Sequence, residues 1–440
     1  MYRLFEEKLK TWKNMDNKRP LVVLGVRQCG KSYIIDKFCK ENFKKYVEIN
    51  LLKDEKLINI YTNVNSYKNR KELLCTTYNL DFNDENTILF VDEAQLCPKF
   101  ITDLKNFCED GINNIILAGS LLTITLRDME EPYPVGKTHL EHLYPMNFEE
   151  YLYAIGKENY ISYIKDSFEK NIACPLHEEL MELFRKYLYV GGMPANLQNY
   201  LDTEKDISKM DKTILNDIKE EYRMDIVKHI KNDKDKLRAQ NIYKNIAPQL
   251  MKENPKFMYA KFDNKERKAD YISALDWLIN SGMVIKCNQI TNSLYPIKAY
   301  EDDNNYKLYL SDIGLLRDII NATSIDVLME GDYPYKGVLT ENYVALELLK
   351  QFGELFYWTK KNDGQGNKSE VDFIVQINDK IVPIEVKSNK NQAKSLKEYN
   401  DLFHPELMIK VGNYNFGYKD NIKTIPLYAV FLIKDLLVKS

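Results

Sequence analysis

The residues with the clearest chemical meaning lie in the run Gly25–Ser32, whose sequence is GVRQCGKS. This run matches the pattern G-x-x-x-x-G-K-[ST], in which a glycine-rich loop wraps a phosphate with successive backbone N–H groups. The helix that follows would point its positive N-terminal end at the same phosphate. We expect Lys31 to bridge the β- and γ-phosphates of ATP and Ser32 to ligate Mg²⁺. The predicted nucleotide-binding residues of this segment are Gly25, Val26, Arg27, Gln28, Cys29, Gly30, Lys31, Ser32 and Tyr33.

A second nucleotide element follows the apolar run Thr87–Val91, which ends in Asp92 and Glu93. We expect Asp92 to bind the nucleotide and its Mg²⁺, and Glu93 to act as the general base that polarises the attacking water. The alternative is that this acidic pair only caps the next helix. A third apolar run leads to Ser120, which either senses the γ-phosphate or belongs to a simple turn at a strand end.

A further set of charged residues lies near the C-terminus. In an extended strand, residues two apart share a face, so Glu385 and Lys387 project together. Asp372 on the preceding strand can join them, and Glu341 on the helix before it can reach the same edge. Carboxylates that converge in this way hold Mg²⁺, and a nearby lysine positions or activates water. We predict all four as catalytic, with Asp372 and Glu385 as metal ligands; the alternative is a solvated hairpin face.

A basic segment with interleaved aromatic residues precedes a predicted helix that ends near Gly282. Such a patch could contact the phosphates of DNA. The alternative is a solvated face on a fold that serves only for packing between domains. The residues of the patch are Lys256, Phe257, Tyr259, Lys261, Phe262, Lys265, Arg267 and Lys268.

The first 150 residues alternate short apolar runs with helix-length segments, which predicts strands buried on both faces of a parallel sheet. The fold class is therefore α/β. The predicted strands are Pro20–Leu24, Tyr46–Asn50, Thr87–Val91 and Asn114–Ala118. Beyond them the strand signal gives way to amphipathic helices, predicted at Phe148–Ala154, Leu176–Tyr189 and Lys212–His229.

The rest of the chain predicts two further parts. Between residues 241 and 290 the order is helix, turn, helix and a β-like pair that begins at Met283–Lys286, which is typical of a small winged helix-turn-helix. After residue 335 the pattern returns to α/β, with a helix at Leu339–Phe352 and strands at Phe356–Thr359, Val371–Ile377 and Ile381–Lys387. The predicted domains are residues 1–155 (P-loop), 156–235 (helical lid), 236–330 (winged helix) and 331–440.

Composition excludes several classes of protein. The formal net charge is only −3, so any contact with nucleic acid must come from local patches. The seven cysteines form no C-x-x-C pair, which argues against a disulfide framework or a zinc site. The N-terminus has no signal-peptide pattern and no apolar run approaches ~18 residues, so we expect a cytoplasmic protein with no membrane segment. His139 and His142 are interpreted as ordinary strand residues.

Several blocks, taken as a set, resemble the AAA+-type bacterial and archaeal ATPases that carry a C-terminal domain of unknown function, DUF4143. The resemblance covers nearly the whole chain and implies an AAA-like parallel sheet, a helical lid, a winged-helix portion and a nuclease-like C-terminal fold. The blocks are LGVRQCGKS, FVDEAQ, LAGS, LEHLYPMNFEEYL, YLYVGGMP, KLYLSDIGLL and KGVLTENYVALELL.

The resemblance also bears on individual residues. The C-terminal set looks like the PD-(D/E)xK nuclease fold, whose catalytic positions match Glu341, Asp372, Glu385 and Lys387. One departure concerns Lys137, where the family often has arginine. Because lysine offers no planar fork to phosphate, an arginine-finger role at this position is in doubt. The unassigned candidates for such a role are Arg127, Arg185 and Arg223.

Two hypotheses follow for the function. In the first, an ATPase motor or switch is coupled to a DNA-facing winged helix and a nuclease-like module, with DNA as partner. In the second, ATP governs association with a protein partner or with further copies of the chain as a homo-oligomer, and the nuclease-like fold is an inactive scaffold. A nucleotide kinase is disfavoured because no segment supplies a second small-substrate pocket.

Overall fold

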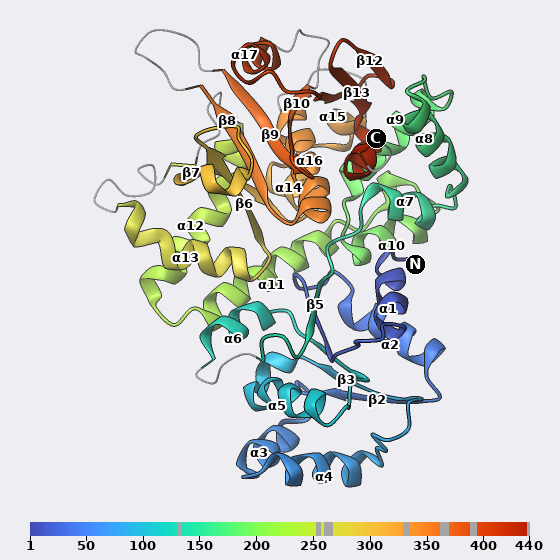
Figure 1. The fold of residues 1–440 in the computed structure, drawn as a ribbon, viewed down its shortest axis with the longest axis vertical. Coiled ribbons are helices and arrows are strands. Elements are labelled where there is room, and N and C mark those ends of the chain that lie inside the picture. The colour runs from blue at the N-terminus through green and yellow to red at the C-terminus, as the bar shows by residue number, and fades with distance from the viewer. Residues whose placement is uncertain are drawn as a thin grey trace. The chain divides into compact units, whose positions relative to one another are not determined.

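The computed structural model describes residues 1–129, 134–251, 257–258, 267–328, 335–360, 369–387 and 394–437. The chain divides into two compact units (Figure 1). Unit 1 is Met1–Pro145 with the short segment Asn280–Gly282, and unit 2 is Met146–Ile279 with Met283–Ser440.

Unit 1 is built on a five-stranded parallel sheet with the strand order β2-β3-β4-β1-β5. Its central strands are entirely buried, which explains why their sequences are continuous apolar runs. The strands are β1 (Leu21–Leu24), β2 (Lys45–Asn50), β3 (Thr87–Asp92), β4 (Ile115–Ala118) and β5 (His139–His142). The parallel α/β sheet predicted from the sequence is therefore confirmed, and His139 and His142 are strand residues as expected.

The helices of unit 1 connect these strands in the alternating order of an α/β fold. They are α1 (Phe5–Lys13), α2 (Lys31–Asn42), α3 (Glu55–Asn63), α4 (Tyr67–Tyr78), α5 (Pro98–Glu109) and α6 (Leu122–Asp128). Leu57 of α3, Leu74 of α4 and Leu104 of α5 pack into one core with the strands. A buried ion pair adds to this core, because Arg70 donates two hydrogen bonds to Asp103, at 2.6 and 2.7 Å.

Unit 2 begins with helices only, in agreement with the loss of strand pattern after residue 150. The first group is α7 (Phe148–Ala154), α8 (Asn159–Lys170), α9 (His177–Val190), α10 (Pro194–Asp202), α11 (Thr213–His229), α12 (Asp233–Leu250) and α13 (Lys268–Asn280). The later helices are α14 (Ile313–Ile319), α15 (Ser324–Leu328), α16 (Lys336–Phe352) and α17 (Lys394–Phe403). No helix within the described residues has both the length and the apolar character needed to cross a membrane.

An eight-stranded mixed sheet forms the other half of unit 2, with the order β12-β13-β11-β10-β9-β8-β6-β7 (Figure 1, yellow to red). Helix α16 packs against β7, β8, β9 and β10. The strands are β6 (Val284–Ile290), β7 (Glu301–Leu310), β8 (Leu355–Thr359), β9 (Glu370–Ile377), β10 (Lys380–Lys387), β11 (Met408–Gly412), β12 (Gly417–Lys419) and β13 (Ile422–Pro426).

The strands of the predicted winged helix belong to this same sheet. Strands β6 and β7 pair antiparallel after α12 and α13, in the order that the sequence predicts. Strand β6 also pairs in parallel with β8, so the sheet continues across the predicted boundary at residue 330. The division of the chain into four domains stays a prediction.

Candidate nucleotide site and carboxylate cluster

The predicted nucleotide-binding loop lies between β1 and α2, where the sequence places it. Gly25 has a positive φ of 152°, and a Cβ at this position would clash with the carbonyl oxygen of Leu143. Gly30 stands at the N-terminal end of α2 with φ 95° and provides no side-chain cap. Position 25 therefore requires glycine, because the backbone of Leu143 lies too close for a side chain. At position 30, glycine favours the left-handed conformation that precedes the helix, whose N-terminal end can face a phosphate.

Lys31 is buried and its ammonium group lies within the curve of the loop. Its Nζ donates to the carbonyl oxygens of Gly25, at 2.8 Å, and of Val26, at 2.9 Å. These two bonds hold a positive charge at the place where the loop would surround a phosphate. The arrangement suits the predicted role of Lys31 at the β- and γ-phosphates.

Ser32 and Asp92 meet although 60 residues separate them in the chain. Ser32 Oγ donates to Asp92 Oδ2 at 2.7 Å, and Asn50 Nδ2 lies 3.4 Å from the same oxygen. Burial raises the pKa of Asp92, and the charge of Glu93 adds to this effect, against the opposing hydrogen bond from Ser32. A hydroxyl and a carboxylate oxygen side by side are the hard ligands that Mg²⁺ prefers, so these residues fit that ion.

Glu93 follows Asp92 at the end of β3 in a left-handed conformation, with φ 55°. Its Oε2 accepts a hydrogen bond of 2.5 Å from Gln95 Nε2. A non-glycine residue with positive φ is uncommon, and such positions cluster at active sites. Gln95 was not predicted as a site residue, although it stands in the FVDEAQ block.

Ser120 lies at the end of β4 and is 8% exposed. Within the described residues its Oγ has no hydrogen-bond partner, and neither has Gln95 Oε1. Buried polar groups normally have a hydrogen-bond partner, so a buried polar atom without one indicates a site where a ligand or water can bind. A phosphate oxygen or a bound water would satisfy the Ser120 hydroxyl, in line with its predicted role as a γ-phosphate sensor.

The other predicted residues of the loop differ in what they can offer. The Cys29 thiol is fully buried and donates to Leu143 O at 3.4 Å, so its side chain is turned to the protein. Tyr33 is 58% exposed, and its hydroxyl lies 3.4 Å from the N-terminal ammonium. Arg3, which the sequence did not single out, donates from Nη1 to Cys29 O at 2.8 Å and thereby supports the loop.

The candidates for an arginine finger are dispersed. Lys137 pairs with Glu109 at 3.2 Å, and Arg127 at the end of α6 pairs with the adjacent Asp128 at 2.8 Å. Arg185 lies on α9 and Arg223 on α11, both in unit 2. None of these contacts assigns an arginine finger.

In unit 2, the four predicted nuclease-like residues lie in one charged cluster. Lys387 Nζ pairs with Glu385 Oε1 at 2.5 Å, and Asp372 Oδ2 accepts the backbone N–H of Val386 at 2.7 Å. Glu341 Oε1 accepts the hydroxyl of Tyr309 at 2.7 Å. Glu385 is 1% exposed, and its Oε2 has no hydrogen-bond partner in the described part of the chain. The cluster is therefore mostly buried, unlike a solvated hairpin face.

Two further charged residues complete the cluster. Lys307 on β7 is fully buried, and its Nζ lies 2.9 Å from Glu341 Oε1 and 2.6 Å from Glu370 Oε1. The sequence analysis missed both, although Lys307 opens the KLYLSDIGLL block. Burial alone would lower the pKa of Lys307, but the carboxylates of Glu341, Glu370 and Asp372 raise it well above its ordinary value. Lys307 is therefore an ammonium ion.

The pKa values of the carboxyl groups in the cluster are also shifted by burial and by the neighbouring charges. Burial raises the pKa of Asp372 well above its usual range, and the charges of Glu385 and Glu341 add to the shift. Burial also raises the pKa of Glu385, against the opposing charge of Lys387. Among the residues that the structure describes, no three His, Cys, Asp or Glu side chains are arranged to hold a metal ion. The metal roles of Asp372 and Glu385 stay a prediction.

Comparison with known families finds matches to three segments of the chain. Residues 17–152 match the AAA domain, and residues 336–430 match the domain of unknown function DUF4143. The chain thus matches an AAA domain in its N-terminal part and a DUF4143 domain in its C-terminal part. Between them, residues 181–326 match a second domain of unknown function, DUF8612. The resemblance proposed from the sequence blocks is thus confirmed for the AAA and DUF4143 domains.

Individual relatives are distant. An uncharacterized protein of Methanocaldococcus jannaschii is 25% identical over 409 residues, which cover 90% of this chain and 82% of that protein. The Walker-type ATPase of Pyrococcus abyssi is 17% identical over 72% of this chain and 94% of its own, with a TM-score of 0.41. The ORC2 protein of Aeropyrum pernix is 14% identical over 74% of this chain and 94% of its own, with a TM-score of 0.38.

Only part of the predicted basic patch lies within the described residues. Lys268 at the start of α13 donates to Asp303 O at 2.8 Å, and its ammonium lies 5.0 Å from the centre of the Tyr306 ring. Arg267 and Phe257 are also described. The DNA contact stays a prediction. The patch residues outside the described ranges are Lys256, Tyr259, Lys261, Phe262 and Lys265.

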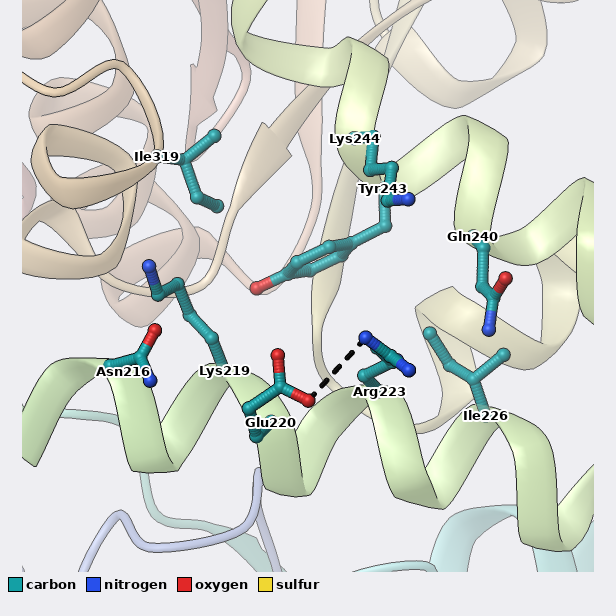
Figure 2. Close-up of a pocket in the computed structure, with 9 residues that line it drawn as sticks. All are labelled: Asn216, Lys219, Glu220, Arg223, Ile226, Gln240, Tyr243, Lys244 and Ile319. Carbon is teal, nitrogen blue, oxygen red and sulfur yellow. Dashed lines mark ion pairs between the residues drawn. The ribbon is translucent and has the colours of Figure 1, made fainter.

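A separate cavity of about 340 Å³ lies between α11, α12 and α14. Figure 2 shows the Tyr243 ring projecting into it, with Lys219 and Arg223 on either side. Lys219 pairs with Asp318 at 2.5 Å, and Arg223 lies 3.6 Å from Glu220. Lys219 and Arg223 thus already have acidic neighbours, and these two contacts identify no ligand for the cavity.

Proposed function

We propose that the AAA domain binds Mg²⁺-ATP and hydrolyses it, and that the nucleotide state governs how unit 2 associates with a partner. The observation that carries this proposal is the 2.7 Å hydrogen bond between Ser32 Oγ and Asp92 Oδ2. It brings the phosphate loop and the acidic end of β3 to one point, next to the buried ammonium of Lys31. Hydrolysis of a triphosphate needs these groups together.

Each residue of the site has a distinct task in this proposal. The backbone of Gly25–Ser32 and the ammonium of Lys31 bind and orient the phosphates. Ser32 and Asp92 would hold Mg²⁺, which neutralises charge on the β- and γ-phosphate oxygens. Glu93 accepts a proton from the attacking water, and Gln95 fixes the carboxylate of Glu93 in place by its hydrogen bond.

Steady-state hydrolysis of ATP by the full chain tests this proposal. We expect Glu93→Gln to bind ATP as the wild type does and to lose about 10²–10⁴-fold in kcat, the usual contribution of a general base. The control is Glu41→Gln, an exposed carboxylate on α2, which should leave kcat unchanged. Equal turnover by wild type and Glu93→Gln would remove Glu93 from the mechanism.

The partner of unit 2 is either protein or DNA. We favour a nucleotide-gated binding switch, because Glu341 and Glu385 already pair with lysines and the DUF4143 domain can serve as a scaffold without cleaving DNA. The second candidate is a DNA-facing nuclease. It is favoured by the buried Oε2 of Glu385, which has no hydrogen-bond partner among the described residues and could accept a metal ligand bond.

Cleavage of plasmid and linear single-stranded DNA distinguishes the two. The assay uses Mg²⁺ and Mn²⁺, with and without ATP, and compares wild type with Lys31→Ala and Lys387→Ala. The switch predicts no cleavage in any sample. Cleavage that Lys387→Ala abolishes would establish the nuclease, and the Lys31→Ala sample would show whether ATP controls it.

A further inference from the structure

Lys307 stands where the carboxylates of unit 2 converge. Its side chain has no exposed surface, and its Nζ bridges Glu341 Oε1 and Glu370 Oε1 at 2.9 and 2.6 Å. Tyr309, two residues along β7, donates to the same Glu341 oxygen at 2.7 Å. Two residues of one strand face thus direct a cation and a hydroxyl at one carboxylate oxygen.

These contacts occupy one oxygen of each carboxylate that a metal would need, and among them only Glu385 also has a buried second oxygen, Oε2, without a hydrogen-bond partner in the described part of the chain. Glu341 Oε1 already accepts two strong hydrogen bonds, one of them from a charged donor. Glu385 Oε1 is taken by Lys387 and Asp372 Oδ2 by the N–H of Val386. A divalent cation would have to displace the ammonium of Lys307 or remain beside it at high electrostatic cost, since both charges are positive and buried.

We propose that Lys307 is a built-in cation of the carboxylate cluster, held by Glu341 and Glu370 in the place that a divalent metal bound by these carboxylates would take. The cluster is then a closed salt-bridge network that joins β7, β9 and α16. Unit 2 thereby has a latent divalent-cation site that replacement of one lysine opens. This inference concerns unit 2 alone and does not depend on whether the AAA domain hydrolyses ATP.

Mn²⁺ binding to the nucleotide-free full chain, followed by electron paramagnetic resonance, tests the inference. All samples carry Asp92→Asn, which removes the predicted metal carboxylate of the AAA domain. With Lys307 present, we expect no saturable Mn²⁺ site in the micromolar range. Lys307→Met should create one such site, and the further change Glu385→Gln should weaken it at least tenfold. Lys286→Met, on the neighbouring strand β6, is the matched control and should create none.

A second variant tests the inference in case Lys307→Met does not fold. Lys307→Met leaves buried carboxylates without their cation, which is strongly destabilising. The double variant Lys307→Met/Glu370→Gln removes one positive and one negative charge together and keeps three carboxyl groups, so it should fold and still bind Mn²⁺. The inference is overturned if the chain with Lys307 binds Mn²⁺ at a site that Glu385→Gln abolishes, or if the folded double variant binds none.

Discussion

At the residue scale, Gln95 is the residue that positions the predicted general base. Its amide donates to Glu93 Oε2 at 2.5 Å, and the backbone of Glu93 adopts a left-handed conformation. Hydrogen bonds to charged groups contribute about 1.5–3 kcal/mol, which corresponds to roughly 10–100-fold in rate if the bond is needed in the transition state. We therefore expect Gln95→Leu to lower kcat by roughly 10–100-fold with little change in ATP affinity.

The measurement for Gln95→Leu is steady-state ATP hydrolysis beside equilibrium ATP binding. Loss of the donated hydrogen bond should leave the Glu93 carboxylate free to turn away from the attacking water, so kcat falls while the affinity for ATP stays as in wild type. An unchanged kcat, or an equal loss of ATP affinity, would show that Gln95 does not act through Glu93. The conservative variant Gln95→Asn is expected to lie between the two.

A second residue-scale prediction concerns the pH dependence of stability. Lys423 on β13 is 6% exposed, and burial lowers its pKa to about 8. Its Nζ donates to Phe168 O at 3.0 Å. Below pH 8 the folded protein buries the charged ammonium of Lys423. The lowering of the pKa from 10.5 to about 8 corresponds to a loss of up to about 3 kcal/mol in the free energy of unfolding. This cost declines as pH rises from 8 to 10.5, where only the unfolded chain still binds the proton.

Lys423→Met should therefore increase the free energy of unfolding at pH 7 by roughly 1–3 kcal/mol, less the lost hydrogen bond. The gain should shrink towards pH 10. Denaturant unfolding at several pH values measures it, and Lys419→Met on the exposed partner strand β12 is the control. A variant that is less stable than wild type at pH 7 and at pH 10 alike would contradict the assignment.

At the element scale, the buried ion pair between Arg70 and Asp103 connects α4 to α5. Both side chains are at most 4% exposed, and Tyr61 of α3 donates to the same carboxylate at 2.8 Å. Removal of one partner leaves a buried charge without compensation, which typically costs 3–5 kcal/mol. We expect Arg70→Met to destabilise the protein by about that amount in thermal or denaturant unfolding.

The control for Arg70→Met lies next to it in the sequence. Lys71 pairs with Asp110 at 2.6 Å, but both side chains are about a third exposed or more. Exposed pairs contribute roughly 0–1 kcal/mol, so Lys71→Met should have little effect. Similar losses of stability in the two variants would show that the Arg70 pair is not the link between α4 and α5.

The helices and strands were the features of the structure that the sequence predicted best. Strands such as Thr87–Asp92 are buried on both faces, and their continuous apolar runs are local signals. The pairing of β6 with β8 was not predictable, because it joins segments separated by about seventy residues and no local pattern specifies it. Lys307 and Glu370 were missed for the same reason, since the contact that gives them meaning exists only in the folded chain.

The nucleotide site was more predictable because its loop is contiguous in sequence. The spacing of Gly25, Gly30 and Lys31 is itself the geometry of the loop. The contact of Ser32 with Asp92 follows because β1 and β3 end at the same edge of a parallel sheet, with β4 between them. Arg3 lacks such a signal, because its bond to Cys29 O depends on how the first residues return to the loop.

At the scale of the whole molecule, the proposal couples nucleotide state to association. We expect Mg²⁺-ATP to change the oligomer size or the partner binding of the wild-type chain, because the nucleotide would bind the two states of the protein with different affinity. Lys31→Ala should not respond. Light scattering after size-exclusion chromatography, with ATP, ADP and no nucleotide, measures this. Identical profiles in all three conditions would contradict a nucleotide-gated change in oligomer size.

Binding of Mg²⁺-ATP by the loop at Gly25–Ser32 underlies every other part of the proposed function, and equilibrium titration of the full chain with ATP in the presence of Mg²⁺ measures it. We expect saturable binding by wild type and at least a hundredfold weaker binding by Lys31→Ala, because the variant loses the ammonium that we propose binds the phosphates. Lys40→Ala, an exposed lysine on the same helix, should bind as wild type does. Equal affinity of wild type and Lys31→Ala, or no binding by either, would show that this loop is not an ATP site.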